Sequence, residues 1–180
     1  MQNLIPYLVT VLLSTFIAWA PVRAESAKQS FDKGYRSHLN GNHANAAKYY
    51  TRAINGNPSF VQAYLMRAAT YHSQNQYERA IKDYTKVIEL GEAYFKAVGY
   101  FNRGLVRYDV GKYKAAISDF TSALSFDEKM ANAYLHRGIA KGRTGDRNGQ
   151  VKDFANAARY GDYEVRQWLE QHAPHILERK

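Results

Sequence analysis

A short motif recurs along this chain at a nearly constant spacing, and this periodicity constrains the fold more than any other feature. The motif is Tyr-x-x-Arg followed by Gly or Ala, and its arginines, Arg67, Arg103 and Arg137, are 36 and then 34 residues apart. An upstream segment around Gly34 follows the same pattern at an offset of 34 residues. Repetition at this period is typical of a solenoid, in which each repeat is one supersecondary unit that stacks on its neighbours.

The residues inside one copy predict two helices joined by a turn. Tyr100, Gly104 and Tyr108 are spaced by four residues, so they share one face of a helix. Gly111 then interrupts the pattern and predicts the turn. The return helix carries a buried apolar stripe, which consists of Ala116, Phe120, Ala123 and Leu124. One such hairpin cannot bury its own apolar face, so stacked neighbours must cover it.

In spacing and residue types these copies resemble the tetratricopeptide repeat family. The resemblance implies an all-α fold, a right-handed α-solenoid of about four helical hairpins with a C-terminal capping helix. The expected repeats are residues 27–60, 61–96, 97–130 and 131–160, and the expected capping helix is 163–172. The chain departs from the family pattern where a Trp is usual, because three repeats have Tyr there and the first has Ser30. The residue before the glycine is Arg in three repeats and Lys33 in the first, where the family has Leu.

An aspartate follows each motif arginine at a distance of 16 residues. The pairs are Arg67 with Asp83, Arg103 with Asp119, and Arg137 with Asp153. In the first repeat both positions differ together, since they hold Lys33 and Tyr49. The joint change predicts a structural ion pair between the two helices of each hairpin. The alternative is that the arginines form a row that binds an anionic ligand.

The N-terminal residues are typical of a secretory signal peptide. Residues 4–22 are almost wholly apolar, and Val22-Arg23-Ala24 supplies small residues at the −3 and −1 positions of a cleavage site before Glu25. We therefore expect a signal peptide over 1–24 and an exported repeat domain over 25–180, in the periplasm or secreted. The alternative is an uncleaved inner-membrane anchor facing the periplasm, since the apolar run is just long enough to span a bilayer.

The charge and the absence of cysteine limit the classes of partner and chemistry. The formal net charge is +9, which raises nucleic acid as a partner. The export signal argues against it, and we expect no nucleic acid to bind. The excess of basic residues lies mainly in the first and fourth repeats, which is typical of a solvated surface. The alternative is that these basic ends attract an anionic membrane or an acidic partner. The chain contains no cysteine, which excludes disulfides and thiol chemistry.

No motif for catalysis or cofactor binding emerges, so we expect a non-enzyme without cofactor or metal. His172 and His175 have a metal-like spacing, but Pro174 lies between them and no acidic ligand stands at a fitting offset. His38 and His72 occupy the same repeat position, and two histidines alone make a weak metal site.

The family resemblance implies a concave groove lined by the first helix of each repeat, where a protein or peptide binds. The expected groove residues are Phe31, Tyr35, His38, Leu65, His72, Phe101, Leu105, Tyr108, Leu135 and Ile139. The family's chaperone-tail clamp requires Lys and Asn where this chain has Phe31 and Tyr35, so that subtype is not supported. An apolar groove usually marks a binding site. The alternative is that these residues pack between helices or lie under the C-terminal tail.

The sequence thus predicts a protein-interaction scaffold of the bacterial periplasm or cell envelope, which holds an extended peptide or a partner helix. One alternative is an accessory assembly subunit of an envelope machine such as a secretion system, a pilus or a cell-wall complex. Another is a membrane-tethered scaffold that retains its N-terminal helix.

Overall fold

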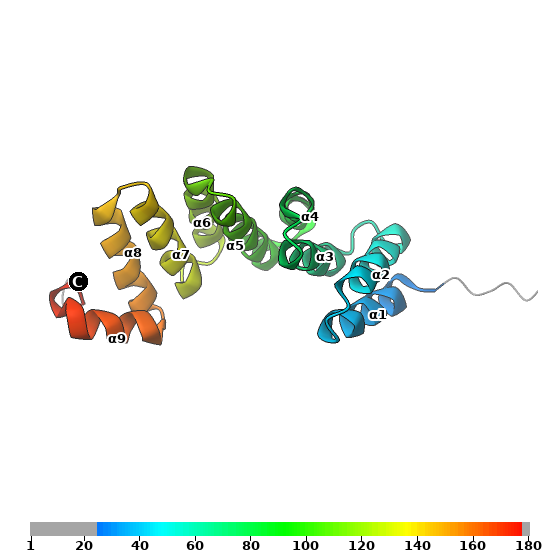
Figure 1. The fold of residues 1–180 in the computed structure, drawn as a ribbon, viewed down its shortest axis with the longest axis horizontal. Coiled ribbons are helices and arrows are strands. Elements are labelled where there is room, and N and C mark those ends of the chain that lie inside the picture. The colour runs from blue at the N-terminus through cyan, green and yellow to red at the C-terminus, as the bar shows by residue number, and fades with distance from the viewer. Residues whose placement is uncertain (1–24, 178–180) are drawn as a thin grey trace, which may run out of the picture.

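The structure is a computed structural model that describes residues 25–177, so the predicted signal peptide lies outside the described residues. This part of the chain is all-α, and its helices follow one another as hairpins along an elongated arc (Figure 1). The elements are α1 (Ala27–Leu39), α2 (His43–Gly56), α3 (Val61–Ser73), α4 (Tyr77–Leu90), α5 (Ala93–Asp109), α6 (Tyr113–Phe126), α7 (Ala131–Arg143), α8 (Arg147–Arg159), α9 (Tyr163–His172) and the 3-10 turn η1 (Pro174–Ile176). The predicted solenoid of four hairpins with a terminal helix is confirmed.

The turn inside each hairpin has the same backbone conformation. Gly41, Gly111 and Gly145 adopt φ values of 71°, 75° and 86°, in the left-handed region that glycine enters without steric cost. The second hairpin has Asn75 at the matching place, with φ 59°. Asn is among the residues that tolerate this region best, so the turn is kept without glycine.

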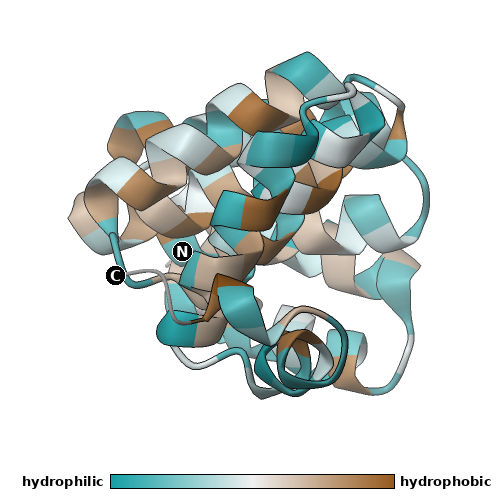
Figure 2. Ribbon diagram, turned by 90° about the vertical axis from the view of Figure 1, so that its left-hand side faces the viewer, coloured by the Kyte–Doolittle hydropathy of each residue, from teal (hydrophilic) through white to brown (hydrophobic). Residues whose placement is uncertain are grey.

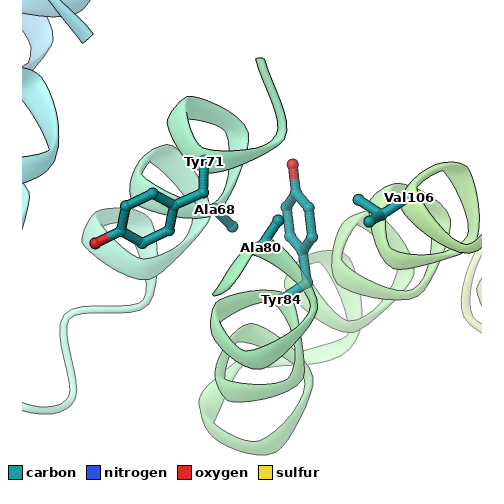
Figure 3. Close-up of a cluster of buried hydrophobic side chains, with 5 residues drawn as sticks. All are labelled: Ala68, Tyr71, Ala80, Tyr84 and Val106. Atoms are coloured by element: carbon teal, nitrogen blue, oxygen red, sulfur yellow. The ribbon is translucent and has the colours of Figure 1, made fainter. Parts of the chain in front are cut away.

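The core lies between the two helices of each hairpin and between successive hairpins. In the second repeat it consists of Ala68, Tyr71, Ala80 and Tyr84, which pack with Val106 of the next repeat (Figure 3). The core therefore continues from one repeat into the next. Viewed along the long axis, most helices show both hydrophilic and hydrophobic residues, because each buries one face only (Figure 2).

The small residue of the repeat motif permits close packing within the hairpin. A Cβ added at Gly104 would lie 2.7 Å from Cε1 of Phe120, which is fully buried on α6. No such distance is compatible with van der Waals contact, so the glycine is required by the aromatic ring opposite it. Tyr50 occupies the equivalent place in the first repeat, where Gly34 faces it.

Helix α5 is longer than the other first helices, as the two-residue insertion in the second repeat predicts. It has 17 residues, whereas α3 and α7 have 13 each. The additional residues are at its N-terminal end and bring Tyr94 and Phe95 into helical structure, with ring centroids 5.4 Å apart. Tyr94 is 72% exposed, so the added turn presents an aromatic side chain to solvent.

In the fourth repeat, two residues that differ from the repeat pattern are accommodated by their neighbours. Gln150 stands where the earlier repeats have a buried Ala, and its side chain lies against Gly142 of α7, where a Cβ would meet Nε2 at 2.8 Å. Gly149 donates its backbone N–H to Oδ1 of Asp146, the N-cap of α8, at 2.8 Å. Gly142 therefore makes room for Gln150, and Gly149 makes room for the Asp146 cap.

Helix α9 covers the end of α8 mainly through one side chain. Leu169 is buried, whereas the adjacent Trp168 is 51% exposed and stacks on His172, with ring centroids 5.0 Å apart. Arg166 fixes the helix by donating from Nη2 to the carbonyl oxygen of Ala158 at 2.8 Å. Within residues 25–177, no helix combines the length and apolar character needed to cross a bilayer.

Candidate peptide-binding groove

The ten predicted groove residues all lie on the first helices of the four hairpins. Helices α1, α3, α5 and α7 are neighbours in the solenoid, and their equivalent positions form one continuous strip. None of the ten side chains is fully buried. Tyr35 is the most accessible, at 46% exposed, and the others are half-buried. The strip is therefore a surface that another molecule can contact, although much of it also packs against the protein's own core.

The apolar members of the strip contribute to the core. The ring of Phe31 lies 5.6 Å from Tyr50 on α2 and 5.0 Å from Phe60, the N-cap residue of α3, with both distances measured between ring centroids. Phe101 contacts Phe120 at 5.8 Å and His136 at 5.7 Å. Truncating either phenylalanine would therefore alter the fold as well as the surface, because both rings fill space between helices.

Leu65, Leu105 and Tyr108 have the same double role, since each packs against a buried cluster. Leu135 and Ile139 lie half-buried on α7. Among the expected aromatic anchors, Tyr35 combines the greatest exposure with the least packing.

Polar contacts between adjacent repeats cross one end of the groove. His38 Nδ1 lies 3.2 Å from Oγ1 of Thr70. His72 Nε2 lies 2.7 Å from Oδ2 of Asp109, and these two residues come from α3 and α5. This end of the groove is therefore cross-linked by hydrogen bonds as well as lined by aromatic rings.

The third contact of this kind joins α5 to α7. Arg143 donates from Nε to the hydroxyl of Tyr108 at 3.2 Å. The groove positions that the family resemblance implies include Asp109 and Arg143 as well as His72 and Tyr108, but sequence reasoning did not predict that these residues pair between repeats. The sequence carried a signal for these pairs. Asp109 comes one residue after the repeat equivalent of His72, and Arg143 comes one residue after the repeat equivalent of Tyr108.

Two histidines on the first helices, His38 in the groove and His136 on α7, are disfavoured as cations. Burial, with a smaller contribution from the nearby His43, lowers the pKa of His38. Burial also lowers the pKa of His136, although the carboxylates of Asp109 and Asp162 oppose the shift. His136 is therefore held neutral against two aromatic rings of the third repeat, Phe101 and Phe120.

The arginine and the aspartate at an offset of 16 residues are in contact in all three hairpins. Arg67 donates from Nε and Nη2 to the two carboxylate oxygens of Asp83, at 2.7 and 2.9 Å. The other two pairs have the same two-bond geometry, Arg103 with Asp119 at 3.0 and 2.8 Å and Arg137 with Asp153 at 2.8 and 2.7 Å. The aspartates are buried, so each guanidinium is engaged inside the hairpin.

Each arginine also reaches the preceding repeat. Its Nη1 donates to a threonine on the second helix of that repeat, at 2.9, 2.9 and 3.2 Å; the threonines are Thr51, Thr85 and Thr121. Although burial works against its charge, the hydrogen bonds and negative charge of Asp83 raise the pKa of Arg67. The contacts make these arginines hairpin and inter-repeat connectors, and their guanidinium groups do not form the lining of the predicted groove.

The third and fourth repeats add a second cation to the buried carboxylate. Arg107 lies 2.8 Å from Asp119, and Lys141 lies 2.9 Å from Asp153. In the second repeat the equivalent position is Tyr71, so Asp83 depends on Arg67 alone.

His38 and His72, considered as a pair of metal ligands, contact different partners. His38 contacts Thr70 and His43, and His72 contacts Asp109 and the ring of Tyr77. Across the described part of the chain, no group of three or more His, Cys, Asp or Glu side chains has a metal-binding arrangement.

Two segments match the sequence model of a known family, described as tetratricopeptide repeat, over residues 61–94 and 97–130. Among curated proteins, the chain is 31% identical over 103 residues to Hsp70-Hsp90 organizing protein 3 of Arabidopsis thaliana, which covers 57% of this chain and 18% of that protein. It is 32% identical over 102 residues to human serine/threonine-protein phosphatase 5, which covers 57% of this chain and 19% of that protein. The match spans about a fifth of the length of these relatives.

Solved structures share the fold at lower sequence identity. MamA superimposes with a TM-score of 0.72 at 20% identity, over 79% of this chain and 82% of MamA. The first TPR of Spaghetti (RPAP3), bound to the HSP90 peptide SRMEEVD, superimposes with a TM-score of 0.63 at 20% identity. That match covers 68% of this chain and 95% of the RPAP3 chain.

Proposed function

We propose that this chain, which has the fold of a tetratricopeptide-repeat solenoid, is a non-enzymatic scaffold that binds an extended peptide or a partner helix along the strip of α1, α3, α5 and α7. The observation that carries the proposal is that the ten predicted groove residues form one strip on α1, α3, α5 and α7 and that none of them is fully buried. Repeat solenoids bind through such extended surfaces. The RPAP3 domain, which has the same fold, is itself bound to a peptide.

The groove suits a partner with both apolar and hydrogen-bonding groups. Tyr35 offers an exposed aromatic ring, whereas Ser73, Asp109 and Arg143 are polar and exposed on the same helices. Aromatic side chains in partly desolvated grooves often supply the largest share of binding energy. Polar groups along the rim fix the orientation of the bound segment more than they add affinity.

We place this scaffold in the bacterial periplasm or cell envelope, on the sequence of residues 1–24. A second candidate is an accessory subunit of an envelope machine, and a third is the same scaffold tethered by its N-terminal residues. Fractionation of the native host separates these cases, because a soluble exported protein, a stable complex and a membrane-bound protein partition differently.

Site-specific photocrosslinking tests the groove directly. A photoreactive amino acid replaces Tyr35 in the groove or, as the control, Tyr163 on α9, which is also exposed. We expect a defined crosslinked partner from the Tyr35 position only. The affinity of that purified partner for Tyr35→Ala should then fall by more than about 2 kcal/mol, as for other aromatic anchors. Equal crosslinking from both positions, or an equal loss of affinity in Tyr163→Ala, would refute a groove-based function.

A further inference from the structure

A hollow between the first and second repeats lies apart from the peptide-binding strip. It has a volume of about 450 Å³ and is formed by α2 together with the turn between α3 and α4. The residues that line this junction pocket are Ala44, Ala47, Lys48, Thr51, Arg52, Tyr71, Gln74, Gln76 and Arg79. None of the ten groove residues is among them, so the pocket is a separate feature of the surface.

Three positive side chains gather in the junction pocket. Lys48 and Arg52 are one turn apart on α2, and Arg79 reaches the pocket from α4. No acidic residue lines the pocket, and among the described residues none of the three forms an ion pair. Like charges at a spacing of four residues destabilise a helix, so this arrangement carries an electrostatic cost that a bound anion would offset.

Arg79 is held in position before any ligand binds. Its Nη2 donates to the hydroxyl of Tyr71 at 2.8 Å, and its Nη1 donates to Oε1 of Gln76 at 2.6 Å. The guanidinium also lies 4.0 Å from the centroid of the Tyr71 ring, which is buried. Figure 3 shows the Tyr71 hydroxyl pointing away from Val106 and toward the side of the first repeat.

The fixed guanidinium keeps unused donors. A guanidinium carries five N–H groups, and the two hydrogen bonds of Arg79 use two of them. The remaining three are available to a ligand beside Lys48 and Arg52. A preorganised cation loses less conformational freedom on binding than a flexible one.

The equivalent junction between the second and third repeats lacks this constellation. The residues at the positions of Lys48 and Arg52 are Lys82 and Lys86, and the position of Arg79 holds Ala115. Lys86 is paired with Glu89 at 2.6 Å. Stacking of the repeats therefore does not require three cations at a junction.

We propose that the junction pocket binds a phosphate group, carried either by a soluble phosphate ester or by a lipid headgroup. Arg matches phosphate oxygens with parallel N–H donors, and Lys adds a mobile point charge. Two arginines and one lysine from two helices can surround such a group on three sides. Lys48 and Arg52, which contribute to the positive charge of the first repeat, would then bind one specific group.

The experiment uses the full chain with two probes, glycerol 3-phosphate in solution and vesicles of phosphatidylglycerol in phosphatidylcholine. Binding is measured for the parent chain, Arg79→Gln, the double variant Lys48→Gln/Arg52→Gln, and the matched control Lys82→Gln/Lys86→Gln. All of the altered side chains lie outside the buried core, and circular dichroism verifies that each variant keeps its helices. The apolar N-terminal segment is common to all of them, so its effect on vesicle binding cancels in the comparison.

We expect saturable binding of at least one probe, with an affinity about tenfold lower in each junction-pocket variant and less than about twofold lower in the control. Binding of glycerol 3-phosphate assigns a soluble ester, and pocket-dependent binding of phosphatidylglycerol vesicles alone assigns a lipid headgroup. Failure of both probes to saturate overturns the proposal. So does an equal loss in the control, because the effect would then come from overall positive charge.

Discussion

Removal of the motif arginine should destabilise the second repeat more than the third. Arg67→Met leaves Asp83 buried without a cation, because Tyr71 stands where the third repeat has Arg107. Breaking a buried pair by removing one partner usually costs about 3–5 kcal/mol, and Asp83 is only 5% exposed. We therefore expect Arg67→Met to lower the free energy of unfolding by about 3 kcal/mol.

Arg103→Met removes the same two hydrogen bonds but leaves the carboxylate paired. Asp119, at 3% exposed, keeps Arg107 at 2.8 Å. The remaining cation should limit the cost to about 1.5–2 kcal/mol, the low end of the range for hydrogen bonds to charged groups. Both repeats are interior, so their neighbours contribute similarly to the measured stability.

Urea unfolding followed by circular dichroism measures the two costs. The double variant Arg103→Met/Arg107→Met should bring the third repeat to the cost of Arg67→Met. A double-mutant cycle of Arg103→Met with Asp119→Asn should give a coupling of about 0.5–3 kcal/mol. An equal or greater cost for Arg103→Met than for Arg67→Met would refute the argument from the second cation. Strict additivity in the cycle would return the arginines to consideration as ligand-binding residues.

Three further outcomes are expected. Tyr50→Phe should raise the free energy of unfolding by about 1 kcal/mol in thermal or urea unfolding, because its buried hydroxyl has no hydrogen-bond partner among the described residues and the third repeat has Phe120 in that place; a loss of stability would contradict this. Since burial lowers the pKa of His136, the unfolded chain binds its proton first as the pH falls through about 6.5, so stability should decrease from about pH 7 to pH 5. The variant His136→Gln should show a flatter profile, and an unchanged profile would exclude His136 as a source of the decrease. N-terminal sequencing of protein from the native host should begin at Glu25, whereas a mature chain that begins upstream would favour the membrane anchor.

The repeat period was sufficient to predict the fold, because each position of the motif has a fixed packing role. The pattern placed Gly104 and Phe120 on the two helices of one hairpin, and in the structure these residues lie against each other. The offset of 16 residues brought Arg103 and Asp119 into contact, since the same helical hairpin recurs in every repeat.

The groove was less predictable, since helix position alone does not determine how far a side chain packs inward. Phe101 and Tyr35 both lie on the expected strip, yet Phe101 fills space beside Phe120 whereas Tyr35 remains exposed. The contact between His72 and Asp109 depends on the distance between neighbouring repeats, and the sequence of one repeat does not determine that distance. Likewise, Gly142 and Gln150 each depart from the repeat pattern when taken alone. Their contact in the structure shows that the small residue makes room for the larger one.

The extra turn of α5 has a consequence for any segment that the groove holds. Four copies of one hairpin repeat the same helix geometry along the groove, so this geometry alone does not fix the register of a bound chain. The four additional residues of α5 extend that helix by about 6 Å and place Tyr94 beyond the ends of its neighbours. This breaks the translational symmetry of the solenoid at one point. A partner that contacts Tyr94 is thereby fixed in a single register and a single direction.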